Sequence, residues 1–205
     1  MKYLFTFLLV IITLNSYTQT NDTLEYYKEI CYKREFQEDL KKPLIFKKDI
    51  TIYLCGDLDT TITEELDKIV SELNSLISSV DITVVNKKEE SNITIFLGGV
   101  DGFLKETFFY DKDQVRKRLE NNWGMFWINH SMDNYISSCR VFIDTERTST
   151  TDERKHLLRE ELTQSLGFPN DSFKYPNSIF YSKWVVDTTE YTNLDKEIIK
   201  IHYQN

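Results

Sequence analysis

The chain has 205 residues, of which 40% are hydrophobic and 14% aromatic, with only six glycines and three prolines. This composition supplies a packed core for about one domain and excludes collagen-like repeats and wholesale disorder. The formal net charge of −8 argues against the basic surface of a typical nucleic-acid-binding protein. We therefore expect a globular domain without a nucleic-acid partner.

The first residues are typical of a secretory signal peptide. Lys2 precedes an apolar run from Leu4 to Leu14, and polar residues follow it. The run is too short to span a bilayer. We expect residues 1–18 to form a signal peptide that is cleaved near Thr18. The mature protein would then be periplasmic or secreted, with no stable membrane span, and the alternative is an uncleaved membrane anchor.

Export would place the three cysteines in an oxidising compartment. Cys31, Cys55 and Cys139 are an odd set, so one pair could form a bridge and leave the third thiol free. Cys55 with Cys139 and Cys31 with Cys55 are equally allowed. The spacing does not match a zinc finger or a redox motif.

The first half of the mature chain predicts a helix, a strand and a longer helix. Residues 24–40 look helical and belong to an N-terminal helical extension over residues 19–44, ahead of a domain over residues 45–205. The β-rich run Ile50–Cys55 ends in a Gly-Asp turn. Thr61 and Glu64 then form a capping box, and apolar residues recur at spacings of three and four as far as Val80. That stripe predicts a helix that covers a sheet.

The rest of the chain predicts four more strands and three helical segments. The strands are expected at residues 82–85, 93–97, 123–128 and 140–144, and an insertion over residues 101–122 carries a helical portion at residues 114–119. Trp123, Phe126 and Trp127 are expected to pack on the sheet, with a role as cleft lining as the alternative. Further helices are predicted from a capping box of Thr150 and Glu153 to about residue 166, and over residues 193–203. The order of elements predicts a mixed α/β (α+β) fold with one sheet.

The helix that begins near Thr151 carries a polar face. His156, Glu160 and Gln164 are four residues apart, so they share one side of the helix, and Glu161 follows Glu160. Gly167 permits a turn that would bring Asn170 and Asp171 back towards that side. The simplest interpretation is that these side chains form a solvated helix face. We prefer the alternative that they point into a cleft. His156 is expected to be solvated.

This spacing resembles the zinc-binding helix of the metzincin metallopeptidases. Their pattern is His-Glu-x-x-His-x-x-Gly-x-x-His/Asp, in which the Glu next to the first ligand deprotonates a metal-bound water. The corresponding residues here are Glu160, Glu161, Gln164, Gly167 and Asn170. The base and the glycine are kept, and all three ligand positions differ.

The downstream residues extend the likeness. Ser178-Ile179-Phe180 is similar to the Ser-Ile-Met turn beneath the metzincin metal, and the segment Thr192 to Tyr203 is similar to the closing helix. A closer match is the exported bacterial family catalogued as domain of unknown function 2927, whose Glu-Glu-Leu-x-Gln-x-Leu-Gly-Leu-x-Asn-Asp-Ser resembles the run from Glu160 to Ser172. The resemblance implies a zincin-like fold, in which one twisted mixed sheet packs against a long helix and an active-site-type helix, with a small C-terminal helical subdomain.

The side chains at the ligand positions argue against tight zinc binding. Zinc prefers imidazole and thiolate, and the amide oxygens of Gln164 and Asn170 are neutral. The all-oxygen set suits Ca²⁺ better, but Ca²⁺ needs six to eight ligands. No metal or other cofactor is expected, and Glu160, Gln164, Asp171 and His156 are only weak candidates for zinc or calcium.

Three functions follow as hypotheses. The favoured one is a non-catalytic descendant of a metallopeptidase whose cleft binds a peptide, a glycan or an envelope protein. The second is a metal-dependent hydrolase with unusual ligands and Glu161 as general base. The third is a structural envelope protein in which the likeness is accidental.

Overall fold

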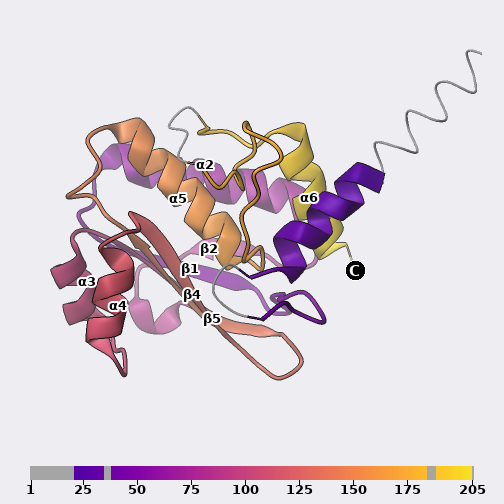
Figure 1. Ribbon diagram of the computed structural model, residues 1–205. Helices are drawn as coiled ribbons and strands as arrows, with labels where there is room; N and C mark the ends of the chain where they lie inside the picture. The colour runs from indigo at the N-terminus through magenta and orange to yellow at the C-terminus, as the bar shows by residue number, and fades with distance from the viewer. Residues whose placement is uncertain (1–20, 35–37, 184–187, 205) are drawn as a thin grey trace, which may run out of the picture.

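The computed structural model describes residues 21–34, 38–183 and 188–204. Its centre is one sheet of five strands in the order β2-β1-β3-β5-β4 (Figure 1). The strands are β1 (Ile50–Gly56), β2 (Ile82–Val84), β3 (Ile93–Leu97), β4 (Gly124–His130) and β5 (Ile136–Ile143). β4 pairs with β5 in the antiparallel direction, and the other pairings are parallel. β4 is therefore an edge strand.

Helices cover both faces of this sheet. α2 (Thr60–Leu76) and α5 (Thr151–Ser165) contact each other, and α5 also contacts β4 and β5. α3 (Val100–Glu106) and α4 (Lys112–Leu119) pack over a second apolar cluster that includes Phe96 and Phe142. α6 (Asn193–Tyr203) contacts α2, and Figure 1 shows it beside the helical residues 21–32. The predicted fold class, with a mixed sheet against a long helix and a motif-bearing helix, is confirmed.

Several element boundaries differ from the prediction. The long helix is capped by Asp59, whose Oδ1 accepts a hydrogen bond from the Ile62 N–H at 2.9 Å, and it ends at Leu76 instead of Val80. The N-terminal helix ends at residue 32, not 40. α3 was not expected, because its seven residues are too few to show a helical period. The capping box of Thr150 and Glu153 and the bounds of the last helix are confirmed.

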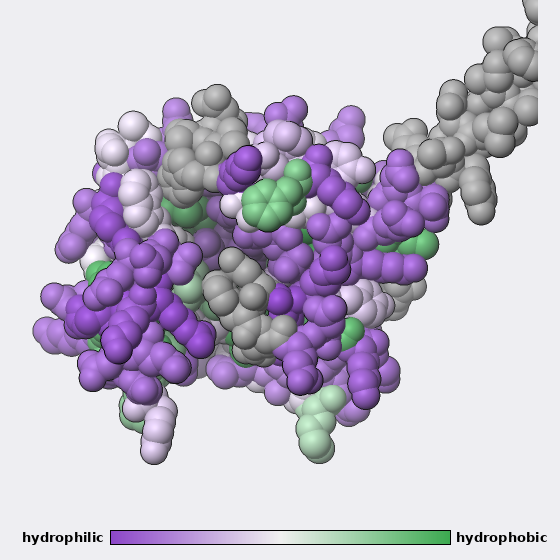
Figure 2. All heavy atoms as spheres, viewed as in Figure 1, coloured by the Kyte–Doolittle hydropathy of each residue, from purple (hydrophilic) through white to green (hydrophobic). Residues whose placement is uncertain are grey.

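One apolar core unites the elements. Tyr26, Ile30 and Cys31 of the N-terminal helix are fully buried in the same cluster as the strands β1, β3 and β5. The predicted division at residue 44, between a helical extension and the following domain, stays a prediction. The one face of the molecule that Figure 2 shows is mostly hydrophilic, with its hydrophobic residues separate rather than gathered in one patch.

All three cysteines are free thiols, so neither disulfide pairing considered from the sequence is formed. Cys139 is buried, and its Sγ donates a weak hydrogen bond to the Ser165 carbonyl at 3.2 Å. The predicted signal peptide lies outside the described residues. Among those residues, none of the helices combines the length and the apolar character that a membrane span requires.

Candidate functional site

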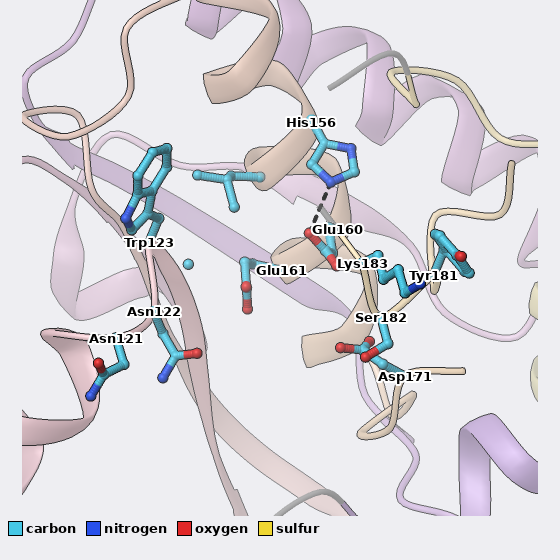
Figure 3. A pocket seen from close by; sticks show the side chains of 12 residues that line it. Asn121, Asn122, Trp123, His156, Glu160, Glu161, Asp171, Tyr181, Ser182 and Lys183 are labelled. Carbon is cyan, nitrogen blue, oxygen red and sulfur yellow. Dashed lines mark ion pairs between the residues drawn. The ribbon is translucent and has the colours of Figure 1, made fainter. Parts of the chain in front are cut away.

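A cleft lies between α5 and the edge strand β4. It consists of two adjoining hollows of about 480 and 530 Å³. Both hollows are lined by residues from β4, α5 and the segment after α5, namely Gly124, Glu160, Glu161 and Asp171. Figure 3 shows Glu160 and Glu161 between the segment that carries Asn121 to Trp123 and the one that carries Tyr181 to Lys183. The structure thus brings the acidic residues of the motif together in one cleft.

His156 and Glu160 form an ion pair one helical turn apart on α5. The His156 Nε2 lies 3.1 Å from Glu160 Oε2, and its Nδ1 lies 2.7 Å from the Thr188 carbonyl oxygen (Figure 3). A carbonyl oxygen only accepts, so Nδ1 carries a proton. Nε2 faces a carboxylate and donates to it when the ring is charged. The expectation of a solvated His156 was wrong, since the side chain is buried and both of its nitrogens face protein acceptors.

The ion pair raises the pKa of His156. Burial by itself lowers this pKa, but the hydrogen bond and charge of Glu160, together with the Thr188 carbonyl, outweigh burial. The folded state therefore holds the proton more tightly than the unfolded state does.

We expect the contribution of His156 to stability to depend on pH. It is fully present below about pH 6.5, the ordinary histidine pKa, and is lost as the pH rises through the raised pKa of the folded state. The free energy of unfolding of the wild type and of His156→Gln should be compared from pH 5.5 to 9. Their difference should shrink as the pH rises. A difference that grows or stays constant would contradict the ion pair.

Glu161 lies deeper in the cleft than Glu160. Its side chain is 7% exposed and packs against the backbone of β4. A Cβ atom added to Gly124 would lie 2.4 Å from Glu161 Oε1 and 2.7 Å from its Cγ. Only a glycine at position 124 therefore leaves room for this carboxylate beside the strand.

The remaining motif residues bind one another or the backbone. The Gln164 amide Nε2 donates to Asp171 Oδ1. The Asn170 amide Nδ2 donates to the carbonyl oxygens of Glu29 at 3.2 Å and Asp171 at 2.6 Å. Asn170 therefore joins the segment after α5 to the N-terminal helix. The turn that permits this begins at Gly167, which has a φ of +118°.

Ser178 and Phe180 lie beneath the cleft and do not line it. The Ser178 Oγ donates to Asp195 Oδ1 at 2.5 Å and accepts from the Tyr26 hydroxyl at 3.0 Å. Burial raises the pKa of Asp195, although its hydrogen bonds with Ser178, Thr192 and Ile179 act in the opposite direction. Phe180 is fully buried, with its ring centroid 5.3 Å from that of Phe168. Both residues support the segment that carries Asp171.

Sequence reasoning missed the residues that hold the opposite rim. Arg147 donates from Nη2 to the carbonyl oxygens of Leu119 and Asn122, at 2.7 and 2.8 Å, and from Nε to Asp144 Oδ2 at 2.7 Å. Asn122 lines both hollows. The three-residue spacing of Asp144 and Arg147 was a usable signal, whereas the carbonyl partners leave no trace in the sequence.

The arrangement does not fit a zinc ion. Within residues 21–34, 38–183 and 188–204, no three side chains of His, Cys, Asp or Glu are grouped so that they could hold a metal. His156 faces Glu160 and Thr188, and Gln164 donates its amide to Asp171. The neutral amides at two of the three ligand positions are poor zinc ligands.

Comparisons with known proteins find a matching family and similar solved structures. The model of a family described as "Protein of unknown function (DUF2927)" matches residues 20–205. A search of the curated proteins finds no match. Two solved structures of myroilysin are similar at 10% and 12% sequence identity. The alignment at 10% identity covers 78% of this chain and 82% of the myroilysin chain, with a TM-score of 0.44. The alignment at 12% identity covers 86% of this chain and 95% of the myroilysin chain, with a TM-score of 0.46.

Proposed function

Since the chain belongs to the DUF2927 family of proteins of unknown function, we propose from its cleft that it is an exported binding domain without peptidase chemistry. Its ligand is an extended peptide segment, free or part of an envelope protein, that lies along the edge of β4. The protein needs no metal for this function.

One observation supports a function that does not use a metal ion. Each residue at a metzincin ligand position has a protein partner: Glu160 pairs with His156, Gln164 with Asp171, and Asn170 with two backbone carbonyls. To bind a metal, these groups would have to exchange satisfied contacts for weaker ligation.

The edge of β4 supports the choice of a peptide. The Asp144 N–H donates to the Trp123 carbonyl at 2.7 Å, so Trp123 and Asp144 form a hydrogen-bonded pair of the antiparallel ladder. The alternation of that ladder turns the N–H and C=O of Gly124, Phe126 and Ile128 away from β5. Among the described strands, only β5 pairs with β4. The outward groups suit strand addition by a peptide.

The larger hollow follows this same edge. It is lined by Phe126 and Ile128, whose side chains face α5, and by Met125 and Trp127, whose side chains face α3 and α4. A hollow that contacts both faces of one strand must pass around its edge. It therefore has the position that an added strand would take.

A proline at position 128 tests this proposal. Ile128→Pro removes an outward N–H but no hydrogen bond to β5, a change that edge strands tolerate. The probe is a pool of N-acetylated, C-amidated hexapeptides in which Thr or Val alternates with randomised residues. We expect the immobilised wild type to retain peptides and Ile128→Pro to bind them roughly tenfold more weakly.

Ile128→Val is the matched control, because it keeps the N–H and most of the side chain. It should bind like the wild type, and circular dichroism should show that all three proteins are folded. Failure of the wild type to retain any peptide, or equal retention by Ile128→Pro, would contradict the proposal.

The alternative function is a hydrolase with Glu161 as general base. The burial of Glu161 in the wall of both hollows favours it. In that case the wild type would cleave some peptides of the pool, and Glu161→Gln would lose cleavage while keeping its fold. We expect no cleavage by either protein, with or without added zinc or calcium.

A further inference from the structure

The hollow along β4 is basic on one side, although the chain as a whole is acidic. Arg34, Arg118 and Arg140 line it, and all three lie outside the smaller hollow that His156 and Glu160 share. Arg34 follows the N-terminal helix, Arg118 lies on α4, and Arg140 lies on β5. Three guanidinium groups on one side of the groove favour an anionic ligand group on that side.

Arg140 is the best placed of the three. It lies opposite Trp127 in the β4–β5 ladder, on the sheet face away from α5, since the adjacent Cys139 bonds to Ser165 of α5. Its guanidinium carbon lies 5.4 Å from the ring centroid of Phe109. The Phe109 and Trp127 ring centroids are 5.2 Å apart. The Phe109 ring, itself packed on Trp127, thus lies beside a half-buried cation.

Arg140 has no carboxylate partner among the described residues. The ion pairs of the described chain involve other arginines, such as Arg147 with Asp144 and Arg159 with Glu65. Glu160 and Glu161, which line the same hollow, belong to α5, which lies on the sheet face opposite to Arg140. A half-buried guanidinium that lines a hollow beside one aromatic ring, without a carboxylate partner, suits a site that receives an anionic group.

The far end of the groove carries a second cation. Arg34 Nη2 lies 3.2 Å from His130 Nε2, and His130 Nδ1 lies 2.9 Å from the Ser131 carbonyl oxygen. A guanidinium always donates, so His130 Nε2 accepts and Nδ1 carries the proton. The guanidinium of Arg34 thus brings a positive charge to this end of the groove.

We infer that the arginine side of the groove binds the carboxylate of an aspartate or glutamate in the bound peptide, with Arg140 as the principal contact. This inference rests on the proposed function, because the peptide's backbone must lie along β4. The acidic α5 side repels the same carboxylate. The two sides together select peptides with an acidic side chain directed towards α4.

The hexapeptide pool tests this preference directly. Peptides that the immobilised wild type retains are identified by mass spectrometry, and we expect Asp and Glu to exceed Asn and Gln about tenfold at one randomised position. Arg140→Gln should reduce this excess to less than twofold and still retain neutral peptides. Raising the NaCl concentration from 50 to 500 mM should weaken the excess in the wild type.

Arg116→Gln is the matched control. Arg116 lies on the same α4 as Arg118, but it pairs with Asp101 and does not line the hollow. It should keep the acidic preference. Retention of peptides without any acidic preference would overturn the inference and leave the proposed function intact, whereas retention of no peptide would overturn both. Preferential capture of polygalacturonate, an acidic glycan, over every peptide would also overturn it.

Discussion

Replacing Arg159 with methionine is expected to lower the free energy of unfolding by about 3–5 kcal/mol. Arg159 lies on α5 and is fully buried. Its Nη2 lies 2.7 Å from Glu65 Oε1, its Nη1 donates to Glu72, and its guanidinium lies over the Tyr191 ring. Methionine fills much of the same volume but leaves the buried Glu65 carboxylate without its cation, which is the costly step.

Urea unfolding of the wild type and of Arg159→Met measures this loss. Arg154→Met is the matched control, because Arg154 joins the same two helices through a more exposed pair with Asp59 at 3.5 Å. That pair should contribute less than about 1 kcal/mol. A triple variant with Glu65→Gln and Glu72→Gln should recover part of the stability. Equal effects at positions 154 and 159 would contradict the assignment.

Gly167→Ala is expected to destabilise the protein by about 2–5 kcal/mol. Gly167 has a φ of +118°, which L-residues rarely adopt. An added Cβ would lie 2.1 Å from the Leu44 carbonyl oxygen and 2.7 Å from His202 Nε2. Relief of this overlap requires the backbone to move, because the first obstacle is a carbonyl group.

Gly102→Ala provides the comparison for thermal and urea unfolding. Gly102 lies in α3, and an added Cβ would be 3.0 Å from a ring carbon of Phe96. We expect a change within about 1 kcal/mol, because alanine favours the helix and the ring can shift slightly. If Gly167→Ala is as mild as Gly102→Ala, the turn after α5 does not depend on a glycine.

The sequence predicted the elements with a strong local pattern. Each of these patterns lies within a short stretch of the sequence: the apolar stripe of α2, the β-rich run of β1 and the capping box of α5. Asp59 was missed as the cap of α2 because Thr61 and Glu64 offered a competing capping box two residues later. α3 was missed because its seven residues cover barely two turns.

The candidate site was predictable only in part, because local sequence patterns do not report contacts between distant segments. The helical period places His156, Glu160 and Gln164 on one face, but it does not say whether that face is solvated. Their partners, Thr188 and Asp171, lie on the segment beyond α5 and become neighbours only through the tertiary fold. The space that Gly124 leaves for Glu161 likewise joins two elements far apart in the sequence. Long-range contacts of this kind leave no periodic signal.

The proposed function depends on one feature of the cleft, namely that its motif residues bind protein partners in place of zinc. Isothermal titration of the chelator-treated protein with ZnCl₂ at pH 7 tests it, with Glu160→Gln and Gln164→Ala titrated alongside. We predict no site tighter than about 0.1 mM in any of the three proteins, since the one imidazole there, that of His156, is held between Glu160 and the Thr188 carbonyl, and the amide of Gln164 is a poor zinc ligand. One equivalent of zinc bound by the wild type with a Kd below about 1 μM, and lost in both variants, would contradict the account.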